Sequence, residues 1–430
     1  MPQRDAYETD WIVEVNESLK CMPTDERQYW KKRSIYRVPT SVTDLNRKAF
    51  QPQSVSFGPY HHGKSHLRTM EDHKCRAFLQ FLRRSGKPLD PFLESLREVA
   101  RDLEESYDTL GPEWKEGGRE GAGDRFLKLM IIDGCFMLEI LRAATQEVDD
   151  YEPDDPIFHT RGMLYIMPYI WPDMLMLENQ LPMLVLDRLV AVESDGKEDD
   201  EYINRLILNY CSPVKHTARI GKCLHVLDVV RKSLLLYEKP KPDKVGCEGF
   251  LLVRSATELI EHGIRLKKSK TKSLTDISFA GGVLSLPEVV VEEATESMFL
   301  NLITFERFHV RTGNEVTSYI YFMDYIIDNV CDVTLLHNLG IVLNVLGDDK
   351  ETTELFHLMA KYTTIEPDNS LIAVCNEVNE YCNKPWNKWR ANLIQTYFRS
   401  PWALLSLIAA IFLFALATIQ TVYTVLSYKT

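Results

Sequence analysis

A long apolar run close to the C-terminus is the feature that most restricts how this chain can fold. Residues 402–425 read WALLSLIAAIFLFALATIQTVYTV and contain no charged side chain. As a helix that rises 1.5 Å per residue, this run would be roughly 36 Å long, which is enough to cross the hydrocarbon core of a bilayer with some tilt. The sequence therefore predicts one C-terminal transmembrane helix over 402–425. The alternative is a helix buried in a protein core.

The flanks of this run predict its orientation. Four basic residues lie shortly before it, Lys384, Lys388, Arg390 and Arg399, whereas Lys429 alone follows it. Positive charge stays on the cytoplasmic side of a membrane. We therefore expect a single-pass, tail-anchored protein whose N-terminal part faces the cytosol, in either the plasma membrane or the endoplasmic reticulum.

Aromatic and basic side chains near the run suggest contact with lipid headgroups. Trp386, Trp389, Arg390 and Trp402 are the predicted membrane-interface residues, because Trp is enriched where the bilayer meets water. One helical face within 386–399 is apolar, which predicts a juxtamembrane amphipathic segment; it comprises Trp386, Trp389, Leu393, Ile394, Tyr397 and Phe398. The alternative is a final helix packed on the globular domain.

The composition is that of a folded protein. Of 430 residues, 45% are hydrophobic and 26% are charged, which is typical of a globular chain. The net charge of −12 argues against nucleic acid as a partner, because phosphate would be repelled. The nine cysteines are scattered without a C-x-x-C pair, which favours reduced thiols.

Apolar periodicity predicts a mainly α fold. Helices are expected at 67–84, 92–107, 126–144, 169–192 with a break at Pro182, 202–210, 218–237, 250–261, 295–310, 317–346, 350–362 and 370–383. A small β insertion is expected at about 274–292, where alternating and β-branched residues surround Gly281-Gly282. The acidic segment 147–155 and the basic run 265–272 are interpreted as an exposed linker and a solvated loop.

The expected organisation follows from these patterns. Residues 1–33 are a polar N-terminal leader, and residues 34–385 are a large, cytosolic, mainly helical globular domain. The juxtamembrane segment 386–399 and the transmembrane helix 402–425 complete the chain.

A histidine-rich stretch raises the question of a metal or catalytic site. Residues 54–74 read SVSFGPYHHGKSHLRTMEDHK and contain four histidines. Zinc needs three or four ligands at about 2 Å. His66 and His73 would lie roughly 10 Å apart along a helix axis, too far to share an ion. We therefore predict no metal here. The favoured interpretation is an extended SVSF segment and a Gly58-Pro59 turn, with His61 or His62 bonding backbone groups of the turn.

A second polar group lies within an apolar stretch. Glu178, Asn179 and Gln180 interrupt DMLMLENQLPMLVLDRL at 173–189. Buried polar groups need hydrogen-bond partners, which favours a structural network or a helix junction before Pro182. Phosphate-binding, dinucleotide-binding and nucleophile-elbow motifs are not found in the sequence.

The ordered set of motifs is similar to a known family. The strings YRVP, FQPQSVSFGPYHHG, MEDHK, DGCFMLE, DMLMLENQLP, ATEL, GVLSLP, NLITFE, TSYIYFMD, GIVLNVLGDD, WNKWRANLIQTYFRSPWA and QTVYTVLSY, within 34–428, resemble the plant domain-of-unknown-function 247 family. Departures are Met183-Leu184, where paired phenylalanines are common, and Thr43, where arginine is common. The family-motif positions here are Gly58, Pro59, Tyr60, His61, His62, Gly63, Glu178, Asn179 and Gln180.

The resemblance implies a plant protein with a C-terminal membrane helix, no known enzymatic activity, no cofactor and no catalytic residues to carry over. Some grass members are linked to self-incompatibility. We therefore expect a non-enzymatic, membrane-anchored interaction or recognition protein whose partners are the lipid bilayer and an unknown protein. The alternative is an enzyme whose site uses His61, His62 and Glu178. A pocket that brings these three together, with a shifted histidine pKa, would favour the enzyme. The sequence leaves the oligomeric state open.

Overall fold

The computed structural model describes residues 32–429 except 45, 116, 212–218, 237–253, 311, 362, 364–370 and 399–400, and in addition Ile12 and Val15. The predicted polar leader, residues 1–33, lies almost wholly outside the described residues. The chain divides into two compact units, and we describe each by itself. Unit 1 comprises Met1–Ser233 and Leu300–Gly313, and unit 2 comprises Leu234–Phe299 and Asn314–Thr430.

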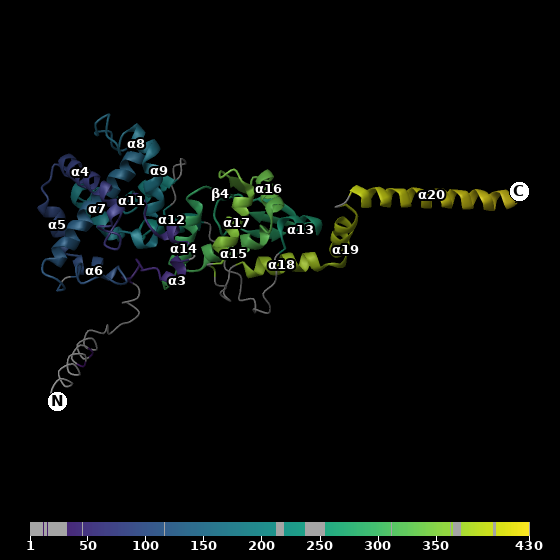
Figure 1. Ribbon diagram of the computed structural model, residues 1–430, viewed down its shortest axis with the longest axis horizontal. Coiled ribbons are helices and arrows are strands. Elements are labelled where there is room, and N and C mark those ends of the chain that lie inside the picture. The colour runs from purple at the N-terminus through teal and green to yellow at the C-terminus, as the bar shows by residue number, and fades with distance from the viewer. Residues whose placement is uncertain are drawn as a thin grey trace. The chain divides into compact units, whose positions relative to one another are not determined.

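Unit 1 is helical. Its elements are α3 (Thr40–Thr43), η1 (Arg47–Phe50), η2 (Ser65–Leu67), α4 (Arg68–Ser85), α5 (Asp90–Arg97), α6 (Ala100–Glu105), α7 (Ala122–Ala144), α8 (Thr160–Tyr165), α9 (Met167–Met174), η3 (Leu177–Asn179), α10 (Met183–Ser194), α11 (Tyr202–Cys211), α12 (Val226–Leu234) and the second half of α14 (Thr295–Phe308). Figure 1 labels most of them.

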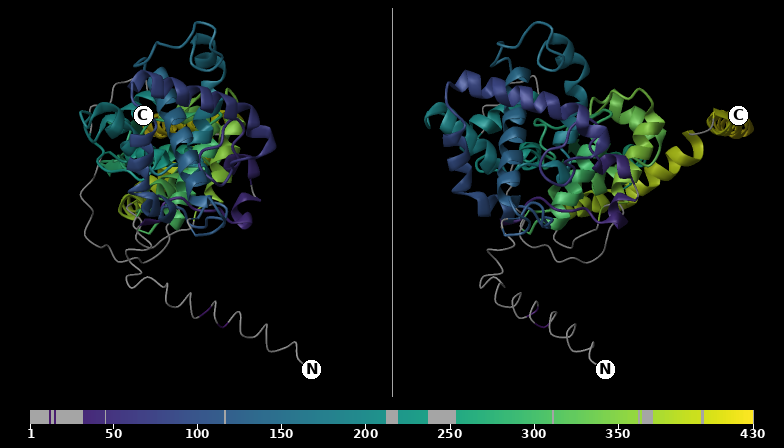
Figure 2. Two further views of the ribbon diagram at one scale, coloured as in Figure 1. Left: turned by 90° about the vertical axis from the view of Figure 1, so that its left-hand side faces the viewer. Right: turned by 60° about the vertical axis from the view of Figure 1, so that its left-hand side comes forward.

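Helix α7 is the centre of unit 1. Most of its side chains are buried, and it packs against α4, α5, α10 and α11. Helices α4 and α7 pack against each other, and Figures 1 and 2 show the ribbon from three directions. At Gly134 a Cβ atom would lie 2.7 Å from Leu189 Cδ1 and 2.9 Å from Val185 Cγ1. Glycine at this position therefore lets α10 approach the backbone of α7 closely.

Unit 2 combines helices with short strands. Its elements are α13 (Ala256–Glu261), β1 (Arg265–Lys268), β2 (Ser278–Ala280), β3 (Val283–Leu286), β4 (Val289–Val291), the first part of α14, α15 (Glu315–Ile326), α16 (Val330–Asn338), β5 (Val342–Asn344), α17 (Asp349–Ala360), α18 (Ile372–Asn383), α19 (Pro385–Leu393), the π-helix η4 (Ile394–Phe398) and α20 (Pro401–Lys429). Strand β3 pairs in parallel with β1 and antiparallel with β2, while β4 pairs in parallel with β5.

The prediction of a mainly helical chain with a small amount of sheet is confirmed, but several boundaries differ. Strand β1 forms within the basic run 265–272, which was expected to be a loop. Strand β5 interrupts the expected helix 317–346. The expected helix pair 169–192 is α9, η3 and α10, and α10 begins directly after Pro182.

The predicted transmembrane helix is contradicted. Among the residues that the structure describes, no helix is both long enough and apolar enough to cross a bilayer. This finding also overturns the single-pass, tail-anchored topology, the cytosolic orientation derived from it, and the assignment to the plasma membrane or endoplasmic reticulum.

The predicted juxtamembrane segment begins as a packed helix. Helix α19 buries Asn387 and Ala391 and contacts α13 and α18, as expected for the alternative of a final helix on the globular part. Arg390 lies so close to Gly263 that a Cβ there would be 2.8 Å from Arg390 Nη1. Trp386 and Trp389 are exposed, with ring centroids 5.2 Å apart. The side chain of Trp402 lies outside the described residues.

Candidate functional site

The extended segment before the histidine motif is held by buried side chains from the second motif. Asp173 accepts hydrogen bonds from three consecutive backbone N–H groups, those of residues 53–55, at 2.6 to 2.9 Å. Asn179 accepts from Phe57 N at 2.7 Å and donates to Val55 O at 3.0 Å. The backbone groups of this segment thus find partners without a neighbouring strand.

Gln180 and Gly58 fix the turn that follows. Gln180 Nε2 donates to Met174 O at 2.6 Å and to Met176 O at 2.8 Å. Gly58 has a φ of +71°, and a Cβ there would lie 2.7 Å from Tyr107 Oη and 2.9 Å from Gln180 O. Only glycine fits this backbone without displacement. The interpretation of Asn179 and Gln180 as parts of a structural network is confirmed.

A buried ion pair lies beneath this turn. Lys74 Nζ is 2.8 Å from Asp133 Oδ1 and 2.8 Å from Glu71 Oε1, and it donates to Ser56 Oγ at 3.2 Å. The other oxygen of Asp133 accepts from Gly58 N at 2.9 Å. Burial raises the pKa of Asp133, while Lys74 acts in the opposite direction. Because Lys74 and Asp133 are fully buried, we assign them a structural role.

His61 and Glu178 are brought together. His61 is 1% exposed, its Nδ1 lies 2.7 Å from Lys64 Nζ, and its Nε2 lies 3.3 Å from Glu178 Oε2 without the alignment of a hydrogen bond. Since the Lys64 ammonium can only donate, His61 Nδ1 accepts and Nε2 carries the proton. Glu178 Oε1 accepts from Val38 N at 2.6 Å. Burial lowers the pKa of His61, and Glu178 opposes that shift.

His62 takes a different position. Its ring meets the Trp114 ring edge-on at 5.5 Å, and its Nδ1 is 3.9 Å from Glu71 Oε2. The expectation that His61 or His62 bonds backbone groups of the turn is wrong for the described residues. His66 contacts a backbone group ahead of the turn, with 3.1 Å between its Nε2 and Pro52 O.

A pocket of about 490 Å³ opens beside the motif. Its lining includes Arg37, Pro59, Tyr60, His62, Thr109 and Trp114. The Arg37 guanidinium lies 4.1 Å from the centre of the Tyr60 ring and 4.0 Å from Glu178 Oε2, and its side chain is half exposed. His61 and Glu178 do not line this pocket. The structure therefore brings two of the three proposed enzyme residues together and leaves His62 on the pocket wall.

Sequence reasoning missed Arg37 and Trp114. Trp114 lies in the glycine-rich segment 111–123. A tryptophan within such a polar loop was the available signal, because an exposed loop has little reason to carry a large aromatic side chain. Arg37 lies within YRVP, a string that entered only through the family resemblance.

No group of three or more potential metal ligands converges within the described parts of the chain. The seven described cysteines, at 75, 135, 211, 223, 331, 375 and 382, are free thiols. Burial raises the pKa of Cys135, which keeps its thiol protonated and unreactive.

The chain is similar to known proteins over most of its length. A family profile described as a plant protein of unknown function, domain of unknown function 247, matches residues 35–416. The chain belongs to this plant family. The resemblance seen in the sequence is thereby confirmed, and the matched range includes the histidine motif, the Glu178–Gln180 motif and Arg37 of this family member.

Two Arabidopsis thaliana proteins are similar over most of their length. UPF0481 protein At3g47200 is 32% identical, and the alignment covers 92% of this chain and 86% of that protein. Putative UPF0481 protein At3g02645 is 20% identical, and the alignment covers 96% of this chain and 94% of that protein. No solved structure matches the chain.

Proposed function

We propose that this family member is a recognition protein that binds a segment of a partner protein in the pocket beside the histidine motif. The observation that carries the proposal is the pocket lining, which combines Arg37, Tyr60 and Trp114. Arginine, tyrosine and tryptophan are the residue types that most often dominate the energy of protein interfaces. A volume of about 490 Å³ is within the range of ligand pockets and suits one or two side chains.

The arrangement of Arg37 favours a ligand. Its guanidinium is held against the face of Tyr60, so little side-chain freedom is lost when a ligand binds. Within the described chain its contact with a carboxylate is confined to Glu178 at 4.0 Å, which is too long for a hydrogen bond. Several of its N–H donors therefore remain available for a partner.

The same geometry weighs against the enzyme alternative. A general base must reach the proton that it removes. His61 is buried, with one ring nitrogen at Lys64 and the other at Glu178. Nε2 makes no hydrogen bond, but it is buried and out of reach of a substrate in the pocket, so we propose a role without catalysis. Recognition is also the kind of activity that self-incompatibility, linked to some grass members of the family, requires.

The proposal is tested by selecting displayed peptides against the full chain and measuring their affinity by calorimetry. Arg37→Ala and Trp114→Ala should each weaken binding at least about tenfold, as expected for central hot-spot residues. Arg47→Ala and Trp386→Ala remove exposed residues of the same types elsewhere and should leave the affinity unchanged. Selected peptides that bind both pocket variants as tightly as the unmodified chain would contradict the proposal.

A further inference from the structure

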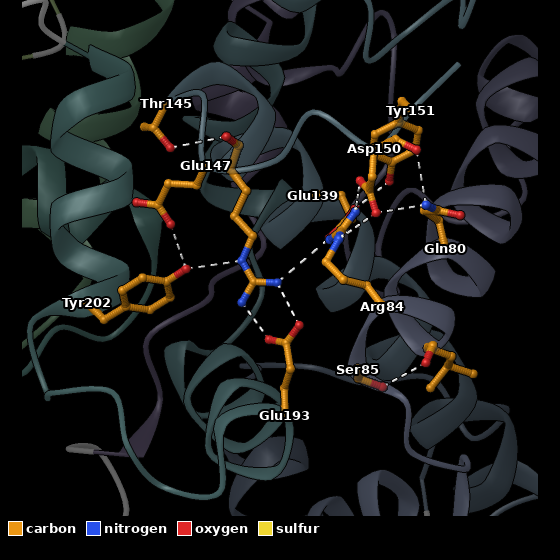
Figure 3. A network of polar contacts seen from close by, with 12 residues as sticks. Gln80, Arg84, Ser85, Glu139, Thr145, Glu147, Asp150, Tyr151, Glu193 and Tyr202 are labelled. Atoms are coloured by element: carbon orange, nitrogen blue, oxygen red, sulfur yellow. Dashed lines mark hydrogen bonds and ion pairs between the residues drawn. The ribbon is translucent and has the colours of Figure 1, made fainter.

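The acidic segment 147–155 is largely exposed, as expected, but it is fixed to the core of unit 1 and is not a free linker. Arg84 donates to both carboxylate oxygens of Glu139, at 2.6 and 2.8 Å, and its Nη2 lies 2.6 Å from Asp150 Oδ1 (Figure 3). The hydroxyl of Tyr151 donates to Glu139 Oε2 at 2.5 Å. The middle of the segment is therefore bound to α4 and α7 through charge-assisted hydrogen bonds.

A second group of contacts holds the start of the segment. Arg142 donates to both carboxylate oxygens of Glu193, at 2.9 and 2.5 Å, and its Nε donates to Tyr202 Oη at 3.1 Å. Tyr202 in turn donates to Glu147 Oε2 at 2.9 Å, as Figure 3 shows.

The end of the segment is equally constrained. Asp155 pairs with Arg76 and accepts from the backbone N–H groups of Ile157 and Phe158 at 2.9 and 2.8 Å. At Gly162, on α8, a Cβ would lie 2.2 Å from Ile157 O, so α8 packs directly on this turn. The segment is thus preorganised, and a ligand would not have to order it.

A second pocket, of about 530 Å³, lies between this segment, the end of α7 and the start of α8. Its apolar lining comprises Ala143, Ala144, Val148, Phe158, Met163 and Leu164. The rings of Tyr151 and Phe158 stack at 4.2 Å in its wall. Leu164, Tyr165 and Tyr169 on α8 and α9 are 64%, 68% and 63% exposed, so large apolar side chains face water close to this pocket.

The charge around the second pocket is strongly negative. Residues 146–165 contain six carboxylates and one arginine, Arg161. Glu147, Asp150 and Asp155 have the partners described above. Asp149, Glu152 and Asp154 are exposed and have no ion-pair partner in the described part of the chain. Asp149 also lines the pocket.

We propose that this second pocket is a docking surface for a cationic, amphipathic segment of a partner protein. An apolar side chain of the partner enters the pocket, and its Lys or Arg residues lie against Asp149, Glu152 and Asp154. Complementary charge accelerates encounter and selects the partner. A second copy of this chain carries a net charge of −12 and would be repelled. This surface is separate from the Arg37 pocket, so it goes beyond the function proposed above.

The test uses the full chain and a fluorescein-labelled helical peptide of roughly 14 residues, about four turns, with Leu and Phe on one face and Lys on the other. Fluorescence anisotropy should show saturable binding that weakens as salt is added. The triple variant Asp149→Lys, Glu152→Lys, Asp154→Lys should weaken binding at least about tenfold. Leu164→Ser, at an exposed position that cannot disturb the core, should also lower the affinity.

Two controls make the result decisive. The triple variant Glu94→Lys, Glu198→Lys, Glu293→Lys changes the net charge by the same amount at exposed positions elsewhere and should bind within about twofold of the unmodified chain. A peptide in which Glu replaces every Lys should not bind. The proposal is overturned if the Lys peptide shows no saturable binding. It is also overturned if the two triple variants lose the same affinity for the Lys peptide, or if the Glu peptide binds as well as the Lys peptide.

Discussion

At the scale of single residues, the motif positions are explained by backbone demands. Gly58 adopts a positive φ against Tyr107. Asn179 satisfies the backbone N–H of Phe57, which is far away in sequence, whereas Gln180 satisfies the nearby carbonyls of Met174 and Met176. His61 meets Glu178, 117 positions later in the chain, through a buried contact. The turn itself could be predicted from Gly58-Pro59, since its local signal is strong. The contact between His61 and Glu178 could not be predicted, because the spacing of two residues in the sequence does not tell whether they meet in the fold.

Replacing Gly58 tests the turn. Gly58→Ala should lower the free energy of unfolding by about 2–4 kcal/mol, the sum of left-handed backbone strain and a close contact. Gly63→Ala is the matched control, because Gly63 also has a positive φ but has no heavy atom within 4 Å of its would-be Cβ. Its loss should be about 1 kcal/mol. Urea denaturation measures both, and equal losses would show that the close approach at Gly58 is unimportant.

The buried His225 predicts a dependence on pH. Its Nε2 contacts Ser34 O at 3.1 Å, its Nδ1 accepts from Asp228 N at 3.2 Å, and burial lowers its pKa to about 4. The unfolded chain therefore takes up the proton first, so stability is full above pH 6.5 and falls as the pH drops from 6.5 towards 4. The expected loss is about 3 kcal/mol.

The control for this prediction is an exposed histidine. His225→Gln should remove much of the acid-induced loss of stability, whereas His337→Gln should leave the pH profile of unfolding unchanged. The prediction is wrong if His225→Gln loses as much stability between pH 6.5 and 4 as His337→Gln and the unmodified chain do.

At the scale of elements, apolar periodicity predicted most helices, while the short strands were harder to assign. Strand β5 follows Gly340, whose φ of +67° breaks the helical pattern that the surrounding apolar residues suggest. A short apolar run has the same composition in a buried strand and a buried helix. Strand β1 was missed because its basic residues mask a single buried position, Leu266.

The network around Glu139 predicts how strongly the segment 147–155 depends on α4. Arg84→Met leaves the buried carboxylate of Glu139 without its bidentate partner, so unfolding free energy should fall by about 3–5 kcal/mol. Amide hydrogen exchange in 147–155 should become faster. Arg97→Met is the matched control, because Arg97 and Asp124 are exposed and their pair contributes about 0–1 kcal/mol. Similar losses in the two variants would argue against the network.

At the scale of the whole molecule, the chain is a member of a plant family, and recognition of other proteins is the function that we propose for it. Its acidic charge was evident from composition, and the family from its ordered motifs. The Arg37 pocket was not predictable, because its lining comes from residues 37, 59–62 and 109–114, which are distant in sequence. The second pocket is lined by residues 143–164 alone, and it was missed because the acidic part of this stretch was interpreted as a linker. The transmembrane prediction rested on hydropathy and on the family resemblance, and the helices of the described chain do not bear it out.

Binding of a peptide in the Arg37 pocket can be observed directly through the indole N–H signal of Trp114 in the NMR spectrum of the full chain. This signal is assigned by its loss in the variant Trp114→Phe. A peptide selected for binding should shift this signal, because the peptide enters the pocket that Trp114 lines. The signal of Trp171, which packs edge-on against Tyr210, should stay in place. A saturating peptide that leaves the Trp114 signal unmoved would contradict recognition at the Arg37 pocket.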